Sequence, residues 1–303
     1  MIRGLQTGEL AALTTALLWT MSTLAWTSAG RRIGALAVTS HRLLITCMLL
    51  SLHGWLTRGH ALPTDADGRT WLLLAISGLL GFFVSDACGF KSLLLIGPRL
   101  ALLVQSISPP TAAIISWAFL GESLTVWHWL AMAVTLSGVV WVVLERAEAT
   151  TAVPISQRHY VRGLLLAGIS AVAQALGMVL ARRGIGEYDA VAATYIRALG
   201  AVPAYIILLT ISGHWPALAR AMSDLRAMTT VAAGSVVGPF LGVALCMVAL
   251  RHSPAGVVTT LVSTMPVLVL PFTVLIYGER VSLRAVLGAL LSVAGIGLMC
   301  ASG

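Results

Sequence analysis

The residues that could do chemistry in this chain are a few ionisable side chains that interrupt long apolar runs. Asp86 and Lys91 interrupt one run, and Arg42 and Arg197 lie near the starts of two others. A charged side chain at membrane depth costs about 2.5–3.5 kcal/mol, so each of these residues needs a function or a partner. Five residues on a helix correspond to about 500° of rotation, so Asp86 and Lys91 are not expected to pair. Asp86 is therefore either a proton-coupling or substrate-binding carboxylate or an interfacial residue.

The two arginines occupy corresponding places in the two halves of the chain, Arg42 in the first and Arg197 in the second. A guanidinium in that place could hold a substrate carboxylate with two parallel hydrogen bonds. It could equally extend from a helix end to the membrane surface as a structural residue. The residue types alone leave both interpretations open.

Other polar and aromatic residues point to a cavity between the halves. Trp19 and Gln174 become equivalent when Gly8 is aligned with Gly163, and we interpret them as opposite cavity walls, with core packing as the competing interpretation. The amide of Gln105 could bind a substrate without the cost of burying a charge. The candidate cavity residues are Trp19, Arg42, Asp86, Lys91, Gln105, Gln174, Tyr195 and Arg197.

Signatures of other function classes are lacking. The chain has no Walker loop and no GxGxxG, HExxH or GxSxG motif, so we expect no enzyme and no ATP-driven pump. Its basic residues fall singly or in pairs between apolar runs, which disfavours nucleic-acid binding. We expect no cofactor, metal site or disulfide, because the cysteines lie in apolar runs without CxxC spacing. They are Cys47, Cys88, Cys246 and Cys300.

The elements that must position these residues are membrane-spanning helices. Of the 303 residues, 58% are hydrophobic and 10% are charged, whereas a soluble protein is about 25% charged. The sequence therefore predicts an all-α polytopic membrane protein, with spans of about twenty residues each. We expect ten spans, near residues 9–29, 36–56, 71–90, 98–119, 126–144, 163–181, 191–211, 228–250, 255–277 and 285–301.

One stretch, residues 106–122, occurs twice in the chain. A shift of 157 aligns Ser106 with Ser263, Pro109 with Pro266, Gly121 with Gly278 and Glu122 with Glu279. Since five helices per half is an odd number, two similar halves must enter the membrane from opposite sides, which predicts an inverted repeat. We expect repeats at residues 1–146 and 163–303, joined by a linker at 147–162.

The prolines and glutamates of this stretch have different expected roles. A proline at mid-span removes a helical hydrogen bond, which is tolerated where a cavity or a neighbour satisfies the freed carbonyl. We interpret Pro109, Pro110 and Pro266 as gating kinks. Glu122 and Glu279 follow Gly121 and Gly278 at turns, and we expect structural turns in which each carboxylate caps the next helix.

Small residues predict close contacts between helices. Gly234, Gly238 and Gly242 recur every four positions and form one smooth helix face. Gly138 and Gly295 correspond across the repeat, on the fifth and tenth spans. Glycine faces of this kind let two helix backbones approach closely in a membrane, so we expect packing at both places.

The repeated tract of residues 106–122 and 263–295 resembles the EamA-type repeat of the drug/metabolite transporter superfamily. Arg42 and Arg197, the proline-bearing fourth and ninth spans and the Gly-Glu turns also fit this family. The resemblance implies secondary transport, a substrate cavity between the halves and both termini in the cytoplasm. The distribution of lysine and arginine between the two ends of the spans favours the opposite orientation.

Taken with these observations, the resemblance implies a plasma-membrane carrier that exports small amphipathic metabolites, above all amino acids, by alternating access. Its expected partners are the lipid bilayer and a small substrate, and transport could be coupled to protons through Asp86. We expect the functional unit to be a monomer or a homodimer. Efflux of cationic drugs is one alternative, although it calls for an anionic pocket and only Asp86 is a candidate. A lipid-modifying enzyme or scaffold is another, but we find no paired nucleophile and base at membrane depth.

Overall fold

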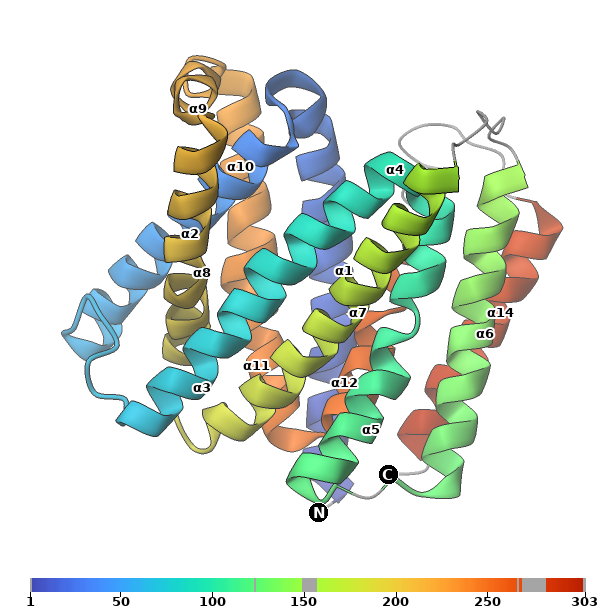
Figure 1. The fold of residues 1–303 in the computed structure, drawn as a ribbon. Coiled ribbons are helices and arrows are strands. Elements are labelled where there is room, and N and C mark those ends of the chain that lie inside the picture. Colours follow the sequence, from blue (N-terminus) through green and yellow to red (C-terminus); the bar gives the residue numbers. More distant parts are fainter. Residues whose placement is uncertain (1, 123, 149–156, 266, 269–281, 302–303) are drawn as a thin grey trace.

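The computed structural model describes residues 2–122, 124–148, 157–265, 267–268 and 282–301, and the regular structure within these ranges is entirely helical (Figure 1). The first half contains α1 (Ile2–Ile33), α2 (Ala35–Arg58), α3 (Gly68–Gly78), the π-helical η1 (Leu79–Ser85), α4 (Asp86–Gln105), α5 (Ser108–Leu120) and α6 (Val126–Glu148). The second contains α7 (Gln157–Ile185), α8 (Ala190–Ser212), α9 (Trp215–Ala221), α10 (Leu225–Ser235), the π-helical η2 (Val236–Gly242), α11 (Val243–His252), α12 (Ala255–Val262) and α14 (Leu283–Ala301).

Long apolar helices dominate this fold. Six helical stretches among the described residues are long and apolar enough to cross a membrane, and shorter apolar helices accompany them. The six are Thr7–Ile33, Ala35–Arg58, Gly68–Ser92, Gln157–Ile185, Ala190–Ser212 and Leu225–His252. The predicted all-α polytopic class is confirmed.

The two halves run in opposite directions through the bundle. In Figure 1, α1 begins beside the N-terminus at the lower end, whereas α7 begins at the upper end. The last helix, α14, ends at the lower end, close to the start of α1. The first helices of the two repeats thus point in opposite directions, as the predicted inverted repeat requires.

Several helix ends are fixed by short polar side chains. Asp67, Asp189 and Asp224 precede α3, α8 and α10, and their side chains accept hydrogen bonds from backbone N–H groups inside these helices. Such caps satisfy donors that a helix leaves unpaired in its first turn. Arg32 also donates to Asp224 over 2.8 Å, which holds the pKa of that carboxyl below its usual range. This contact joins the end of α1 to the start of α10.

The glycine face of α10, η2 and α11 receives three side chains of α1. A Cβ atom placed on Gly234 would lie 2.5 Å from Trp26 Nε1, and one on Gly238 would lie 2.6 Å from Ser22 Oγ. A Cβ atom on Gly242 would lie 2.7 Å from Trp19 Cδ1. The predicted close packing at this face is confirmed, and only glycine fits at these crossings.

Gly138 and Gly295 form a second close crossing, between α6 and α14, the pair on the right of Figure 1. A Cβ atom on Gly138 would lie 2.6 Å from the backbone oxygen of Gly288. A Cβ atom on Gly295 would overlap the backbone nitrogen of Thr135. This predicted contact is also confirmed.

The proline-bearing segment differs from its expected form. Helical structure continues through Gly97 and Pro98, where a break was expected, and ends at Gln105. A new helix, α5, then starts with Pro109 and Pro110 in its first turn. A proline there loses no helical hydrogen bond, so the chain has two helices rather than one kinked helix. The corresponding Pro266 lies outside the described residues.

The lower half of the bundle is filled by an apolar core. Buried side chains of α7, α11 and α12 meet there, and Met178, Met247, Leu250 and Leu261 are at most 1% exposed. Leu74 of α3 is also fully buried in this cluster. The core therefore closes the lower half against water.

Gly295→Ala tests the α6–α14 crossing. The added methyl group overlaps the α6 backbone, and overpacking of this kind costs about 1–3 kcal/mol. We expect a lower thermal midpoint in detergent. Gly297→Ala is the matched control on the same helix, because nothing lies within 4 Å of its Cβ position. Equal midpoints for the two variants would contradict the proposed role of the crossing.

Candidate functional site

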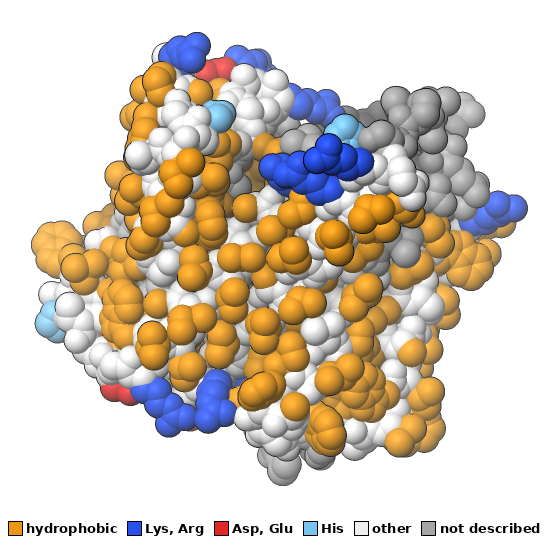
Figure 2. Space-filling view, in the orientation of Figure 1, with side chains coloured by type: hydrophobic (Ala, Val, Ile, Leu, Met, Phe, Trp, Pro, Cys, Tyr) orange, Lys and Arg blue, Asp and Glu red, His pale blue; other side chains and the backbone are white. Residues whose placement is uncertain are grey.

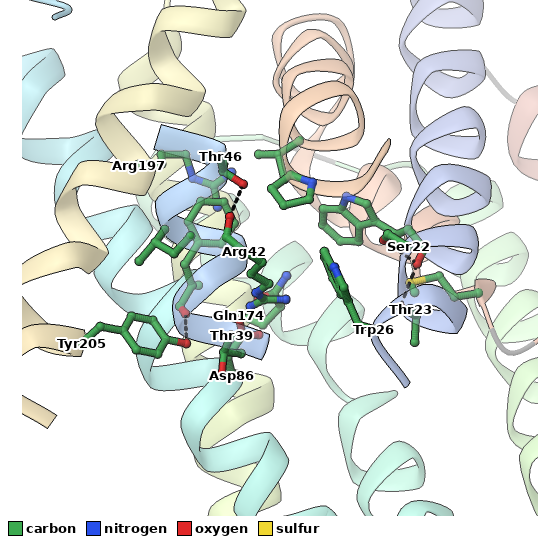
Figure 3. A pocket seen from close by; sticks show the side chains of 17 residues that line it. Ser22, Thr23, Trp26, Thr39, Arg42, Thr46, Asp86, Gln174, Arg197 and Tyr205 are labelled. Atoms are coloured by element: carbon green, nitrogen blue, oxygen red, sulfur yellow. Dashed lines mark hydrogen bonds and ion pairs between the residues drawn. The ribbon is translucent and has the colours of Figure 1, made fainter. Parts of the chain in front are cut away.

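A cavity of about 190 Å³ lies above the lower core, between helices of both repeats (Figure 3). It is lined by Trp19, Ser22, Thr23, Trp26, Thr39, Arg42, Leu43, Thr46, Gly81, Phe82, Asp86, Gln174, Arg197, Tyr205, Pro239, Val243 and Met265. Its walls thus combine aromatic rings, hydroxyl groups and three charged side chains.

Two helices present continuous faces to this cavity. On α1 the lining residues are Trp19, Ser22, Thr23 and Trp26, and on α2 they are Thr39, Arg42, Leu43 and Thr46. Both sets have the spacing i, i+3, i+4, i+7, which places side chains on one side of an α-helix. The hydroxyl groups on these faces donate to their own helices; Thr46 Oγ1, for example, donates to the backbone oxygen of Arg42 over 2.6 Å.

Two π-helical segments border the cavity at positions related by the repeat. Shifting η1 (Leu79–Ser85) by 157 residues gives the bounds of η2 (Val236–Gly242). Gly81 and Phe82 of η1 and Pro239 of η2 line the cavity. The proline explains part of the wide turn, since it has no N–H to donate within a helix. Single π-helical turns inside α-helices occur frequently at functional sites.

Arg42 and Asp86 form an ion pair inside the cavity. The Arg42 side chain is 18% exposed and that of Asp86 is 34% exposed. The Arg42 guanidinium carbon also lies 4.7 Å from the centre of the Trp26 ring. Figure 3 shows Arg42, Gln174 and Asp86 close together, with Trp26 reaching toward them from α1. Asp86 is therefore already partnered by a cation.

Arg197 has a different environment, because it is buried and no carboxylate pairs with it among the described residues. It is 3% exposed, and its Nε atom has no hydrogen-bond partner. Its Nη1 atom donates weakly to Met247 Sδ over 3.7 Å, and its guanidinium carbon lies 5.0 Å from the Phe82 ring centre. A buried guanidinium without an acidic partner is costly in a protein interior. The cavity consequently carries one positive charge in excess, and it can hold an anionic group.

Gly81 makes room for this guanidinium. A Cβ atom at Gly81 would lie 3.2 Å from Arg197 Nη2 and 3.8 Å from Gln174 Oε1. The absence of a side chain at Gly81 thus leaves space in which a ligand atom can reach both Arg197 and Gln174.

The structure brings together five of the predicted cavity residues: Trp19, Arg42, Asp86, Gln174 and Arg197. Lys91 is exposed and Gln105 ends α4, and neither lines the cavity. Tyr195 also lies outside it, against a shallow depression between α2 and α8 that includes Met48 and Trp55. These three positions correct the expected composition of the cavity.

The residue-by-residue prediction missed several lining residues, among them Trp26, Phe82 and Tyr205. Trp26 follows Trp19 by seven positions, so the periodicity of α1 could have identified it. Tyr205 lies eight positions after Arg197, again close to two helical turns, and its hydroxyl donates to the backbone oxygen of Phe82 over 3.1 Å. Phe82 carries no such signal, because the π-helical turn shifts its direction.

Glu122 has a structural role, but not the expected one. Instead of capping the next helix, its carboxylate accepts hydrogen bonds from Arg182 Nε over 2.6 Å and from Ser116 Oγ over 2.7 Å. It also accepts from the backbone N–H of Ala255 at the start of α12, over 3.4 Å. Arg182 in turn donates to the backbone oxygen of Leu250. These contacts join the ends of four helices beneath the apolar core. Gly278 and Glu279 lie outside the described residues.

Glu122→Ala should therefore lower stability. It removes a charge-assisted set of hydrogen bonds, each worth about 1.5–3 kcal/mol, and leaves Arg182 with one partner fewer. We expect a lower thermal midpoint in detergent. Glu187→Ala is the control, because Glu187 is exposed in the turn after α7. A Glu122→Ala variant as stable as this control would contradict the role of the contact.

Comparisons with known proteins agree with this architecture. The EamA-like transporter family matches the chain twice, over residues 6–144 and 161–301. A solved structure described as "Crystal structure of protein" has the same fold, with a TM-score of 0.77 and 23% sequence identity. The similarity covers 97% of this chain and 96% of that chain. No curated protein matches the sequence.

Proposed function

Because this chain belongs to the EamA-like transporter family, and is thus a multi-pass membrane transporter of small molecules, we propose that it exports amino acids across the plasma membrane. The proposal includes related small amphipathic metabolites and transport by alternating access. Both repeats contribute to one cavity, which is the arrangement expected of carriers with inverted repeats.

The observation that carries this proposal is the uncompensated charge of Arg197. The guanidinium is buried, has an unpartnered Nε and borders the cavity beside Gly81. A substrate carboxylate would supply the missing negative charge and accept two parallel hydrogen bonds. Arg197 would then bind the carboxylate of the amino acid.

The remaining groups of an amino acid have partners in the same cavity. Asp86, with 34% of its side chain exposed, can accept hydrogen bonds from a substrate ammonium group while it contacts Arg42. Trp19, Trp26 and Phe82 offer apolar ring faces for the substrate side chain. A zwitterion with an apolar side chain therefore matches the charges and surfaces of the cavity.

The alternatives fit the cavity less well. A cation without a carboxylate would meet an excess of positive charge, because Arg42 and Arg197 line the cavity with Asp86 as the one carboxylate among its described lining residues. The cavity of about 190 Å³ is also smaller than ligand pockets for drug-sized molecules, which measure about 300–1,000 Å³. The charged side chains of this site are the ion pair of Arg42 with Asp86 and the guanidinium of Arg197. Neither arrangement supports an enzyme or scaffold function.

Alternating access requires elements that can change their arrangement. The two π-helical segments border the cavity at repeat-related positions, and the break before Pro109 and Pro110 separates α4 from α5. We assign gating to these places, with the contacts of Glu122 holding the lower end closed. Opening the lower end would then require Arg182 and Ala255 to leave that carboxylate.

Arg197→Gln tests the proposed carboxylate site. We expect counterflow of labelled amino acids in proteoliposomes to fall by at least about tenfold, since a charge-assisted hydrogen bond to a carboxylate is worth about 1.5–3 kcal/mol. Arg197→Lys keeps the charge but not the planar fork, so it should restore flux only in part. No counterflow of any amino acid by the unmodified protein, or full flux by Arg197→Gln, would contradict the proposal.

Asp86→Asn tests proton coupling. The amide variant keeps a carbonyl oxygen that can accept from the substrate ammonium group, so it should still bind substrate, with weaker affinity, but it should lose uptake driven by a pH gradient if Asp86 carries the coupled proton. Both quantities can be measured in proteoliposomes, with counterflow at equal pH as the internal control. Unchanged pH-driven flux would remove Asp86 from the coupling mechanism.

A further inference from the structure

The outer flank of the bundle carries a second concave site, separate from the central cavity. Figure 2 shows hydrophobic side chains across the middle of the bundle and lysine and arginine side chains toward its upper and lower ends, which is the pattern of a surface that contacts lipid. A shallow depression lies where α2 meets α8, in the left part of Figure 1. It is lined by five residues of α2, by Ala61 in the loop after α2 and by Tyr195 of α8, and none of these residues lines the central cavity.

The depression follows the length of α2. Its five α2 residues are Cys47, Met48, Ser51, Leu52 and Trp55. Their spacing of about four residues places them along one side of the helix, over a rise of about 12 Å from residue 47 to residue 55. The hydrocarbon of one membrane leaflet is about 15 Å thick, half of a core of about 30 Å. Because Trp55 lies near the lower end of α2, the depression runs from the lower membrane surface toward the bilayer middle, as one acyl chain does.

The apolar side chains of this depression face the bilayer. Met48 is 60% exposed, Leu52 is 51% exposed and Trp55 is 61% exposed. In a multi-pass membrane protein, apolar side chains exposed on the outside of a helix contact acyl chains rather than water. Tryptophan is common where the hydrocarbon meets the headgroups, and Trp55 lies near that level. We therefore expect lipid, and not water, to fill the depression.

Tyr195 places a polar group in this apolar surrounding. The residue is 7% exposed, and its hydroxyl forms no hydrogen bond with another described residue. The other hydroxyl of the depression, Ser51 Oγ, already donates to the backbone oxygen of Ala61 over 3.0 Å. A hydroxyl without an acceptor in apolar surroundings is costly, so the hydroxyl of Tyr195 calls for an acceptor from outside the chain. Tyr195 lies about 7.5 Å along α8 from the lower end of that helix, the depth at which the ester groups of phospholipids border the hydrocarbon.

We propose that this depression binds one phospholipid molecule, with an acyl chain along residues 47–55 of α2 and an ester carbonyl oxygen that accepts a hydrogen bond from the hydroxyl of Tyr195. The length and depth of the depression fit the acyl chain. The unpartnered hydroxyl selects a lipid that has an acceptor at its level. The lipid is thus held at one place on the protein, unlike the lipids that surround the rest of the bundle.

The bound lipid contacts both helices that carry the arginines of the central cavity. Arg42 lies on α2 and Arg197 lies on α8, and both line the cavity. An apolar cluster that includes Leu50 and Tyr195 joins the two helices. A lipid that binds this arrangement of α2 and α8 stabilises it relative to arrangements in which the depression is closed. This consequence for transport rests on the proposed function, whereas lipid binding itself does not.

Photocrosslinking of the full chain in detergent micelles tests the site. A phospholipid with a diazirine on one acyl chain is added, and the crosslinked peptides are identified by mass spectrometry. The internal control is the stretch 114–119 of α5, near the lower end, where Ile114, Trp117 and Phe119 are 55%, 65% and 71% exposed. We expect the adducts at residues 47–55 to exceed those at 114–119 several-fold and to saturate as the lipid concentration rises.

The hydrogen bond is tested with two unlabelled competitors, an ester-linked phospholipid and its ether-linked analogue with the same headgroup and chains. With the unmodified protein, the ester lipid should halve the labelling at 47–55 at a concentration about two- to tenfold lower than the ether lipid, the range that one net hydrogen bond gives. Tyr195→Phe should abolish this difference. Tyr160→Phe is the matched control, because Tyr160 is exposed at the upper end of α7, and it should leave the difference unchanged. Ala61→Phe adds a ring to the depression and keeps the backbone oxygen that Ser51 contacts, so it should lower the labelling at 47–55 alone.

Three results would overturn the proposal. Equal labelling of 47–55 and 114–119 would mean that lipid surrounds the protein without a site in the depression. Weaker labelling at 47–55 than at 114–119 would mean that a second copy of the chain covers the depression. Equal competition by the ester and ether lipids with the unmodified protein would rule out the hydrogen bond from Tyr195. Crosslinking does not depend on transport, so failure of the amino-acid proposal would leave these results intact.

Discussion

The buried charge of Arg197 is the constraint on which the site depends. The backbones of α3 and α8 touch at its position, since a side chain on Gly78 would overlap the backbone of Arg197. Gly200 meets Ala75 one turn away in the same manner. This contact sets the guanidinium beside the bare backbone of Gly81, where η1 replaces an α-helical turn. Burial without an acidic partner then leaves a positive charge, which we propose that the substrate carboxylate balances.

Much of this architecture could be predicted from the sequence, because it follows from repetition and apolar length. The shift of 157 residues that aligns Pro109 with Pro266 also relates η1 to η2. The glycine faces at Gly138 and Gly234 identified close helix crossings correctly, because glycine in a membrane helix commonly allows a neighbouring helix backbone to approach. Arg42, Asp86 and Arg197 stood out because charge is rare in apolar runs.

The rest depends on tertiary contacts that spacing along the chain does not reveal. Glu122 meets Arg182 and the start of α12, which are far from it in sequence. The π-helical turns arise within runs that read as ordinary apolar helix, so the direction of Phe82 could not be foreseen. Tyr195 and Arg197 lie two positions apart on one helix and therefore point to different sides of α8. Pairing Tyr195 with the cavity was for this reason wrong.

The central claim is that the cavity binds a carboxylate through Arg197, and ligand-induced stabilisation tests it most directly. An L-amino acid with an apolar side chain, its amide and its decarboxylated amine would each be added to the purified protein. A ligand at a hundred times its dissociation constant raises stability by about 2.7 kcal/mol, which a thermal unfolding curve resolves. The account predicts a rise in the thermal midpoint with the amino acid and a much smaller one with the amide or amine. Equal rises with all three ligands would contradict it.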